Sequence, residues 1–337
     1  MKKTALFLAI ISVGLMACKK NKFTIKEFLP ALYELKIAPE LDEVNLSSKA
    51  LLQNWRAIND NDITIAEIEV FQNTYQAYLD DAYAILLYNF GDISKIYVYN
   101  RFYKASIDTN EIWEVYQDNS LTLAEGIQSL NNKVKGLSAI EYLLNNTQAN
   151  DSISQSARYR TFLEWQIEAI SLEMANIEFS WSVYQSNFES MTDEGVEGSY
   201  NMIVNRIIHV LEDLVIKKIG TPVLEAPYYE TSRLAFVKES IEMAYEVFIG
   251  EGTSDFNSIY NHIRKKDKKV ANLVLDDFKA LVEYGDALEN DYAYYYQNNP
   301  EKLTEYVTKI KALMVRFKID IPTLIGISLT FGDNDGD

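Results

Sequence analysis

Apolar side chains recur every three or four residues along this chain, which is the spacing of one face of an α-helix. Two such stripes lie in the first half: Ile68, Phe71, Tyr75, Tyr78, Ala82 and Ile85, and then Leu163, Ile167, Ile170, Met174, Ile177 and Trp181. A third lies in the second half: Val270, Val274, Leu281, Leu288, Tyr292 and Tyr295. No comparable set of short alternating segments indicates strands. The pattern predicts an all-α fold of helices packed on helices, most simply as antiparallel bundles.

Residues that break helices are rare. The 337 residues include 13 glycines and 6 prolines, which favours long helices. The polar segment 187–200 contains Gly195 and Gly198 and divides the chain nearly evenly. A chain of this length usually forms more than one hydrophobic core. We therefore expect a first helical bundle over residues 31–186, a linker over 187–200, and a second bundle with an acidic tail over 201–337.

The N-terminus has the pattern of a lipoprotein signal. Residues 1–17 place Lys2 and Lys3 ahead of a short apolar core, as in a secretory signal. The residues that end at Cys18 resemble a lipobox, in which the chain is cut before a cysteine that receives a diacylglyceryl group. Cys18 is the only cysteine, so a disulfide within the chain is excluded. We expect lipidation at Cys18, an anchor and linker over 18–30, and attachment to a membrane through lipid.

The mature chain is strongly acidic. Removing Lys2 and Lys3 with the signal leaves 30 basic against 49 acidic residues, a net charge of 30 − 49 = −19. Such a field repels phosphate backbones and argues against nucleic acid as a partner. It concentrates cations, which is compatible with metal handling, although solvated acidic helix faces account for the same composition. Lys19 and Lys20 after the anchor argue against the acidic signal for inner-membrane retention, so we expect an outer-membrane lipoprotein that faces the periplasm or the outside.

A glycine-initiated motif precedes an apolar helical run: Gly136, Leu137, Ser138, Ala139, Ile140, Glu141, Tyr142, Leu143 and Leu144. Serine followed three residues later by glutamate predicts a capping box, in which Ser138 accepts from the N–H of Glu141 and Glu141 reaches back to the N–H of Ser138. A second interpretation is that Glu141, at a helix N-terminus facing a groove between bundles, contacts a cation or a substrate. The two interpretations are compatible.

The same residues resemble the signature of the imelysin-like family, which is a glycine, any residue, a histidine, two further residues and a glutamate. Gly136 and Glu141 match this signature, and Ser138 stands in the place of the histidine. Further segments resemble the family in the same order along the chain: Phe71–Tyr75, Asn89–Asp92, Arg158–Trp181, Lys218–Pro222, Pro227–Ser232 and Phe331–Asp337. The resemblance implies two packed four-helix bundles with the signature near their junction, and two halves of similar length allow an ancient duplication.

The family includes peptidases described as insulin-cleaving and proteins of iron uptake. Metal and peptidase sites rely on an imidazole as ligand or proton carrier, and a serine hydroxyl is a poor substitute. The resemblance therefore implies a lipid-anchored binding protein of the cell envelope that serves iron acquisition without catalysis. Its ligand would be iron or another divalent cation, held by Glu141 and Glu230, and its partner an outer-membrane receptor or transporter. The alternatives are a metal-dependent peptidase of the imelysin type and a receptor-associated, glycan-binding or peptide-binding surface lipoprotein.

The two histidines of the chain do not form a metal-binding pattern. Neither belongs to a His-Glu-x-x-His helix, and the positions three residues before them hold Arg206 and Ile259 in place of glutamate. We expect His209 to be a hydrogen-bonded helix residue and His262, in a basic stretch, to be solvated. No catalytic residue is predicted, because Ser138 has no local base that would activate it as a nucleophile.

Overall fold

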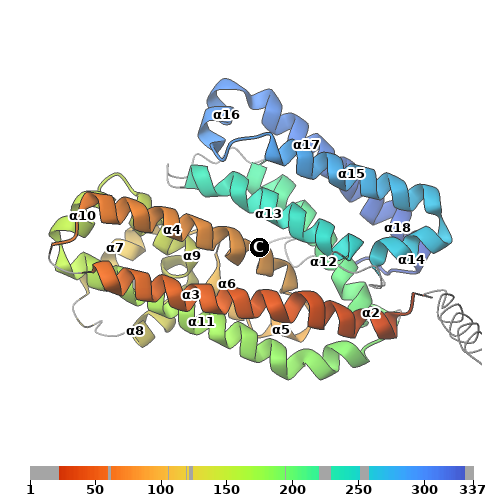
Figure 1. Ribbon diagram of the computed structural model, residues 1–337, viewed down its shortest axis with the longest axis horizontal. Helices are drawn as coiled ribbons and strands as arrows, with labels where there is room; N and C mark the ends of the chain where they lie inside the picture. Colours follow the sequence, from red (N-terminus) through yellow and green to blue (C-terminus); the bar gives the residue numbers. More distant parts are fainter. Residues whose placement is uncertain are drawn as a thin grey trace, which may run out of the picture.

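The computed structural model describes residues 23–59, 62–104, 106–118, 120, 124–193, 195–219, 229–250 and 258–330. Every regular element in these ranges is helical, so the predicted all-α class is confirmed. Figure 1 shows two packed groups of helices, with the N-terminal half of the chain below and the C-terminal half above it. Within the described ranges, none of the helices combines the length and the apolar character needed to span a membrane.

The first bundle comprises the elements up to α11. These are α2 (Ile25–Leu32), η1 (Tyr33–Ile37), α3 (Ala38–Ile58), α4 (Ile65–Ala84), η2 (Ile85–Tyr88), α5 (Asp92–Lys95), α6 (Val98–Phe102), α7 (Thr109–Gln117), α8 (Ala124–Gln128), η3 (Asn132–Val134), α9 (Leu137–Asn145), α10 (Ala149–Gln155) and α11 (Ala157–Ser190). The second bundle comprises α12 (Ser199–Asp213), η4 (Leu214–Ile219), α13 (Tyr229–Ile249), α14 (Ile259–Lys266), α15 (Lys268–Asp286), α16 (Tyr292–Asn298), α17 (Pro300–Val315), η5 (Arg316–Asp320) and α18 (Ile321–Ile325).

Helix α4 begins where the sequence dictates. The hydroxyl of Thr64 accepts from the backbone N–H of Glu67, and the Glu67 carboxylate accepts from the backbone N–H of Thr64, which is a complete capping box. The apolar stripe that follows is buried from Ile68 to Ala82, as its spacing predicts. One face of α4 therefore belongs to the core.

Helix α11 is the central element of the first bundle. The hydroxyl of Ser156 accepts from the N–H of Tyr159, and the helix then runs for 34 residues. Its predicted stripe from Leu163 to Trp181 is buried, and the Trp181 ring packs against the ring of Phe90 with centroids 5.4 Å apart. Each fully buried side chain of this size contributes roughly 1.5–3 kcal/mol to folding. This stripe holds α11 against the core of the bundle.

The third stripe lies on two helices. Helix α15 ends at Asp286, Leu288 is buried in the following turn, and α16 starts after Asp291. The carboxylate of Asp291 accepts from the N–H of Tyr294, which satisfies a first-turn donor and starts a new helix. The apolar period persists across the break because the turn also buries an apolar side chain in the core.

The two bundles meet where α4 packs against α13. Polar contacts cross the junction beside these helices. The guanidinium of Arg206 on α12 donates to the backbone carbonyl of Leu86 at 2.7 Å, and the ammonium of Lys36 on η1 lies 2.7 Å from the carboxylate of Glu246 on α13. Helix α9, which carries the glycine-initiated motif, packs on α4 and α11 from the first bundle. The motif is thereby held beside the junction.

The segment expected to be a linker is partly helical. Helix α11 continues to Ser190, and α12 begins at Ser199. The domain boundaries proposed from the sequence remain predictions. The signal, Cys18 and the acidic tail from Phe331 lie outside the described residues.

Candidate functional site

Gly136 sets the position of the signature helix. It is the N-cap of α9 with φ 83° and ψ −171°, a backbone conformation essentially restricted to glycine. A Cβ at this position would lie 2.6 Å from the backbone oxygen of Phe102 and 3.0 Å from that of Arg101. The glycine therefore permits both the turn and the close approach of α9 to the end of α6.

Ser138 and Glu141 are buried on one face of α9, and each is 1% exposed. Among the described residues, neither the Oγ atom of Ser138 nor the Oε2 atom of Glu141 has a hydrogen-bond partner. Buried polar atoms without partners are rare in folded proteins and costly. Eight further side-chain atoms of the described residues are also buried without a partner, and the two on α9 are distinguished from them by their place in the glycine-initiated motif. We take them as the candidate site.

The predicted capping box is wrong. Helix α9 starts with Gly136 as its N-cap, and no side chain caps it. The carbonyl oxygen of Gly136 accepts from the N–H groups of Ala139 and Ile140, so the first turn closes before Ser138 reaches a capping position. Because Ser138 lies inside the helix, its hydroxyl is turned into the protein and is not used to cap the helix end.

Replacing Ser138 by alanine is therefore expected to leave stability unchanged or to raise it by up to about 1 kcal/mol, since it removes an unpartnered buried hydroxyl. Replacing Thr64 by alanine, which deletes a cap that is present, is expected to cost about 1 kcal/mol. Urea unfolding of the two variants beside the parent chain distinguishes these outcomes. An equal loss in both would show that Ser138 does cap its helix.

The second bundle supplies the polar neighbours of Glu141. The hydroxyl of Ser232, on α13, hydrogen-bonds the Glu141 carboxyl, and the positive charges of Lys218 and Arg233 lie close to it. Burial raises the pKa of Glu141 from its ordinary 4.5 to about 7, and the Ser232 bond and the two cations oppose this rise only in part. Glu141 is therefore partly protonated at neutral pH, and it exchanges a proton in the range where an acid–base or ligand-gated function is effective.

Aromatic rings hold Lys218 in place. Its ammonium hydrogen-bonds the hydroxyl of Tyr103 and lies 4.2 Å from the ring centroid of Phe236, which stacks on the Tyr103 ring. Tyr83 packs edge-on against Phe236, with ring centroids 4.9 Å apart, and burial together with the charge of Glu141 raises its pKa well above 10. Lys218 belongs to η4, a π-helical turn of a kind that is frequent at functional sites.

The described side chains do not form a metal centre by themselves. They include no group of three or more histidine, cysteine, aspartate or glutamate side chains arranged to hold a metal ion. Glu141 can supply one carboxylate ligand, but it lies among cations. The backbone of Glu230 belongs to the first turn of α13, and its side chain is outside the described part. The predicted Glu141–Glu230 ligand pair therefore stays a prediction.

The two histidines lie apart from this site. The ring of His209 lies 3.0 Å from the backbone oxygen of Thr330, which agrees with its expected role as a hydrogen-bonded helix residue. The expectation that His262 is solvated is wrong, because its ring stacks on Phe23 and its Nδ1 lies 2.9 Å from the Tyr200 hydroxyl. Burial and the charges of nearby lysines lower the pKa of His262 to about 4.

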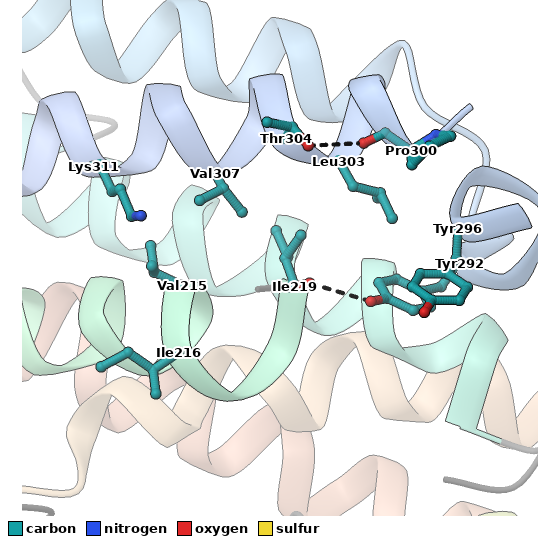
Figure 2. Close-up of a pocket in the computed structure, with 10 residues that line it drawn as sticks. All are labelled: Val215, Ile216, Ile219, Tyr292, Tyr296, Pro300, Leu303, Thr304, Val307 and Lys311. Carbon is teal, nitrogen blue, oxygen red and sulfur yellow. Dashed lines mark hydrogen bonds between the residues drawn. The ribbon is translucent and has the colours of Figure 1, made fainter. Parts of the chain in front are cut away.

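A separate cavity of about 560 Å³ lies between η4, α16 and α17 (Figure 2). It is lined by Val215, Ile216, Ile219, Tyr292, Tyr296, Pro300, Leu303, Thr304, Val307 and Lys311. Two of its hydroxyls are already bonded, since Tyr292 donates to the carbonyl of Ile219 and Thr304 to that of Pro300. The guanidinium of Arg233 lies 4.4 Å from the ring centroid of Tyr292. This wall of the cavity thus adjoins the surroundings of Glu141.

Sequence reasoning identified Gly136, Ser138 and Glu141 but did not nominate Lys218, Arg233 or the Tyr83 hydroxyl as site groups. Lys218 and Ser232 stand in the two second-half segments that resemble the family, which was the available signal.

The fold and the site together define an all-helical protein with a buried, glycine-initiated acidic motif at the contact between two bundles. A family model described as imelysin matches residues 65–313. The chain belongs to the imelysin family.

Solved structures share this fold. An imelysin-like protein from Psychrobacter arcticum 273-4 matches with a TM-score of 0.75 and 13% identity, over 91% of this chain and 97% of that one. A protein from Parabacteroides distasonis ATCC 8503, described as a candidate iron-regulated protein A precursor, matches with a TM-score of 0.67 and 9% identity, over 89% and 97%. No curated protein matches the sequence.

Proposed function

We propose that this protein is a lipid-anchored binding component of the cell envelope that takes part in iron acquisition and is not a catalyst. One observation carries the proposal: among the residues that the structure describes, no group bonds the Oε2 atom of Glu141 or the Oγ atom of Ser138, which are buried on one face of α9. Unpartnered buried oxygens are costly in the free protein, so a ligand that bonds to them recovers that cost on binding.

The chemistry of the site favours binding over bond cleavage. The family position of an imidazole holds Ser138, and both histidines are hydrogen-bonded elsewhere. Carboxylate oxygens are hard ligands suited to iron as cargo. Glu230, in the first turn of α13, is the proposed second ligand. The similarity in fold to a protein described as iron-regulated supports iron as the ligand.

Calorimetry on the full chain carrying Cys18→Ser tests the proposal. The two probes are ferrous sulfate, under anaerobic conditions, and ferric nitrilotriacetate. We expect one saturable site for at least one probe, tighter above pH 7 because Glu141 must lose its proton to coordinate a metal. Glu141→Gln should weaken binding at least about tenfold.

Glu69→Gln is the matched control, because Glu69 is exposed on α4, and it should bind as the parent chain does. Absence of saturable binding of both probes, or equal affinity in Glu141→Gln, would contradict the proposed function. Chelator-sensitive cleavage of an unfolded polypeptide by the purified chain would contradict its non-catalytic part.

A further inference from the structure

The outer face of α11 carries a regular stripe that no described residue covers. Leu172, Phe179 and Val183 are 39%, 69% and 67% exposed, and Asn176 and Ser186 complete a spacing of four and three residues in alternation. This is the spacing of the contact seam between two packed helices. Figure 1 shows α11 along the edge of the first bundle, on the side away from the second bundle.

The stripe is free of charge in a chain that is otherwise strongly acidic. Every exposed residue of α11 from Leu172 to Asn187 is uncharged, whereas the chain has 49 acidic residues. The two glutamates nearest the stripe both have hydrogen-bond partners within the chain. Glu173 accepts from the guanidinium of Arg101 at 3.0 Å, and Glu178 accepts from the amide of Asn45. Two copies of an acidic protein repel each other, and an uncharged face keeps that repulsion smallest where they meet.

A neighbouring apolar tip extends the stripe. Ile96 and Tyr97, between α5 and α6, are 49% and 63% exposed. Arg101 joins this tip to α11, because its guanidinium bonds both the carbonyl of Ile96 and the carboxylate of Glu173. Tyr97 has φ 56°, a left-handed conformation that costs roughly 1–3 kcal/mol in a residue other than glycine and clusters at functional sites. Large exposed apolar side chains that gather on one part of a surface mark an interaction surface.

We propose that this face binds a second copy of the chain, with the two α11 helices antiparallel about a two-fold axis at Phe179. In that arrangement residues equidistant from Phe179 face each other, so Leu172 opposes Ser186 and Val183 opposes Ala175. The two Phe179 rings meet at the axis, and on either side of them a large side chain faces a small one, so the patch is complementary to itself, as a two-fold interface requires. A parallel pairing would place Leu172 on Leu172 and Val183 on Val183, and it would leave the small residues facing each other.

Disulfide trapping tests the geometry sharply, because the full chain with Cys18→Ser contains no thiol. In that background, Phe179→Cys should cross-link to a dimer under mild oxidation. Leu172→Cys and Ser186→Cys should each stay monomeric alone but should cross-link to each other when mixed. Cross-linking of Leu172→Cys or Ser186→Cys alone would indicate a parallel pairing, and absence of cross-linking in Phe179→Cys would overturn the proposal.

Sedimentation of the same full chain tests the association itself. At about 100 µM, above the micromolar dissociation constant expected of a small interface, the particle should have twice the chain mass of 38.7 kDa. Phe179→Glu should sediment as a monomer, since it places carboxylates opposite each other at the axis. Leu46→Glu is the matched control, because Leu46 is 57% exposed on α3, and it should stay dimeric. A monomeric parent chain, including one that instead binds lipid vesicles, would contradict the proposal.

Discussion

Replacing Glu141 by glutamine is expected to remove a loss of about 3 kcal/mol in the free energy of unfolding that the parent chain suffers between pH 4.5 and pH 7. The pKa of Glu141 is about 7 in the folded chain and near 4.5 when unfolded. Between these values the folded state binds more protons, so the parent chain loses stability as pH rises from 4.5 to 7. A shift of this size corresponds to about 3 kcal/mol. Glutamine does not titrate, so the stability of Glu141→Gln relative to the parent should rise by that amount across this window and stay constant outside it.

Urea unfolding at intervals from pH 4 to pH 8 measures this difference. Other groups with shifted pKa values, such as Glu40 and Glu239 at about 7 and His262 at about 4, are present in both proteins and cancel. Glu69→Gln, at an exposed position, should follow the parent chain at every pH. A stability difference between Glu141→Gln and the parent that does not change with pH would mean that Glu141 is not a buried acid.

Gly136→Ala is expected to destabilise the protein by about 3 kcal/mol. Its φ of 83° strains an alanine, and the added Cβ would lie 2.6 Å from the backbone oxygen of Phe102. A backbone outlier and a buried overlap each cost roughly 1–3 kcal/mol. Because backbone cannot yield as a flexible side chain does, α9 must shift, which also displaces Glu141 from Ser232. Thermal and urea unfolding give the loss directly.

Gly195→Ala is the matched control for this substitution. Gly195 has no heavy atom within 4 Å of a Cβ built on it, so alanine there should be tolerated. Equal stability of the two alanine variants would remove the argument that Gly136 fixes the position of the signature helix.

The helices were accessible to sequence reasoning because burial has the same period as the helix. Ile68 to Ala82 on α4 and Leu163 to Trp181 on α11 are buried as their spacing predicts. The break between α15 and α16 was not foreseen, because the apolar period continues through the turn at Leu288. A local signal, the capping carboxylate of Asp291, was present and was outweighed by that periodicity.

The candidate site was also only partly predictable from the sequence. Gly136, Ser138 and Glu141 lie within six consecutive residues, so a sequence motif reveals them. The prediction of a capping box is wrong because a serine three residues before a glutamate fits both an N-cap and a helix interior. The conformation of Gly136 decides between these two positions. Lys218 and Arg233 become neighbours of Glu141 only when the second bundle packs on the first. Similarly, the exposure of Phe179 depends on which faces of α11 other helices cover.

The most direct test of the central claim is the titration of Glu141 itself. The side-chain carboxyl resonance of ¹³C-labelled glutamate, identified by its loss in Glu141→Gln, gives the midpoint with and without gallium nitrilotriacetate, in which Ga³⁺ is a diamagnetic stand-in for ferric ion. We predict a midpoint of about 7 in the free protein, and a lower midpoint when the metal is bound because coordination favours the ionised carboxylate. A midpoint near 4.5, or one that the metal leaves unchanged, would contradict the proposed site.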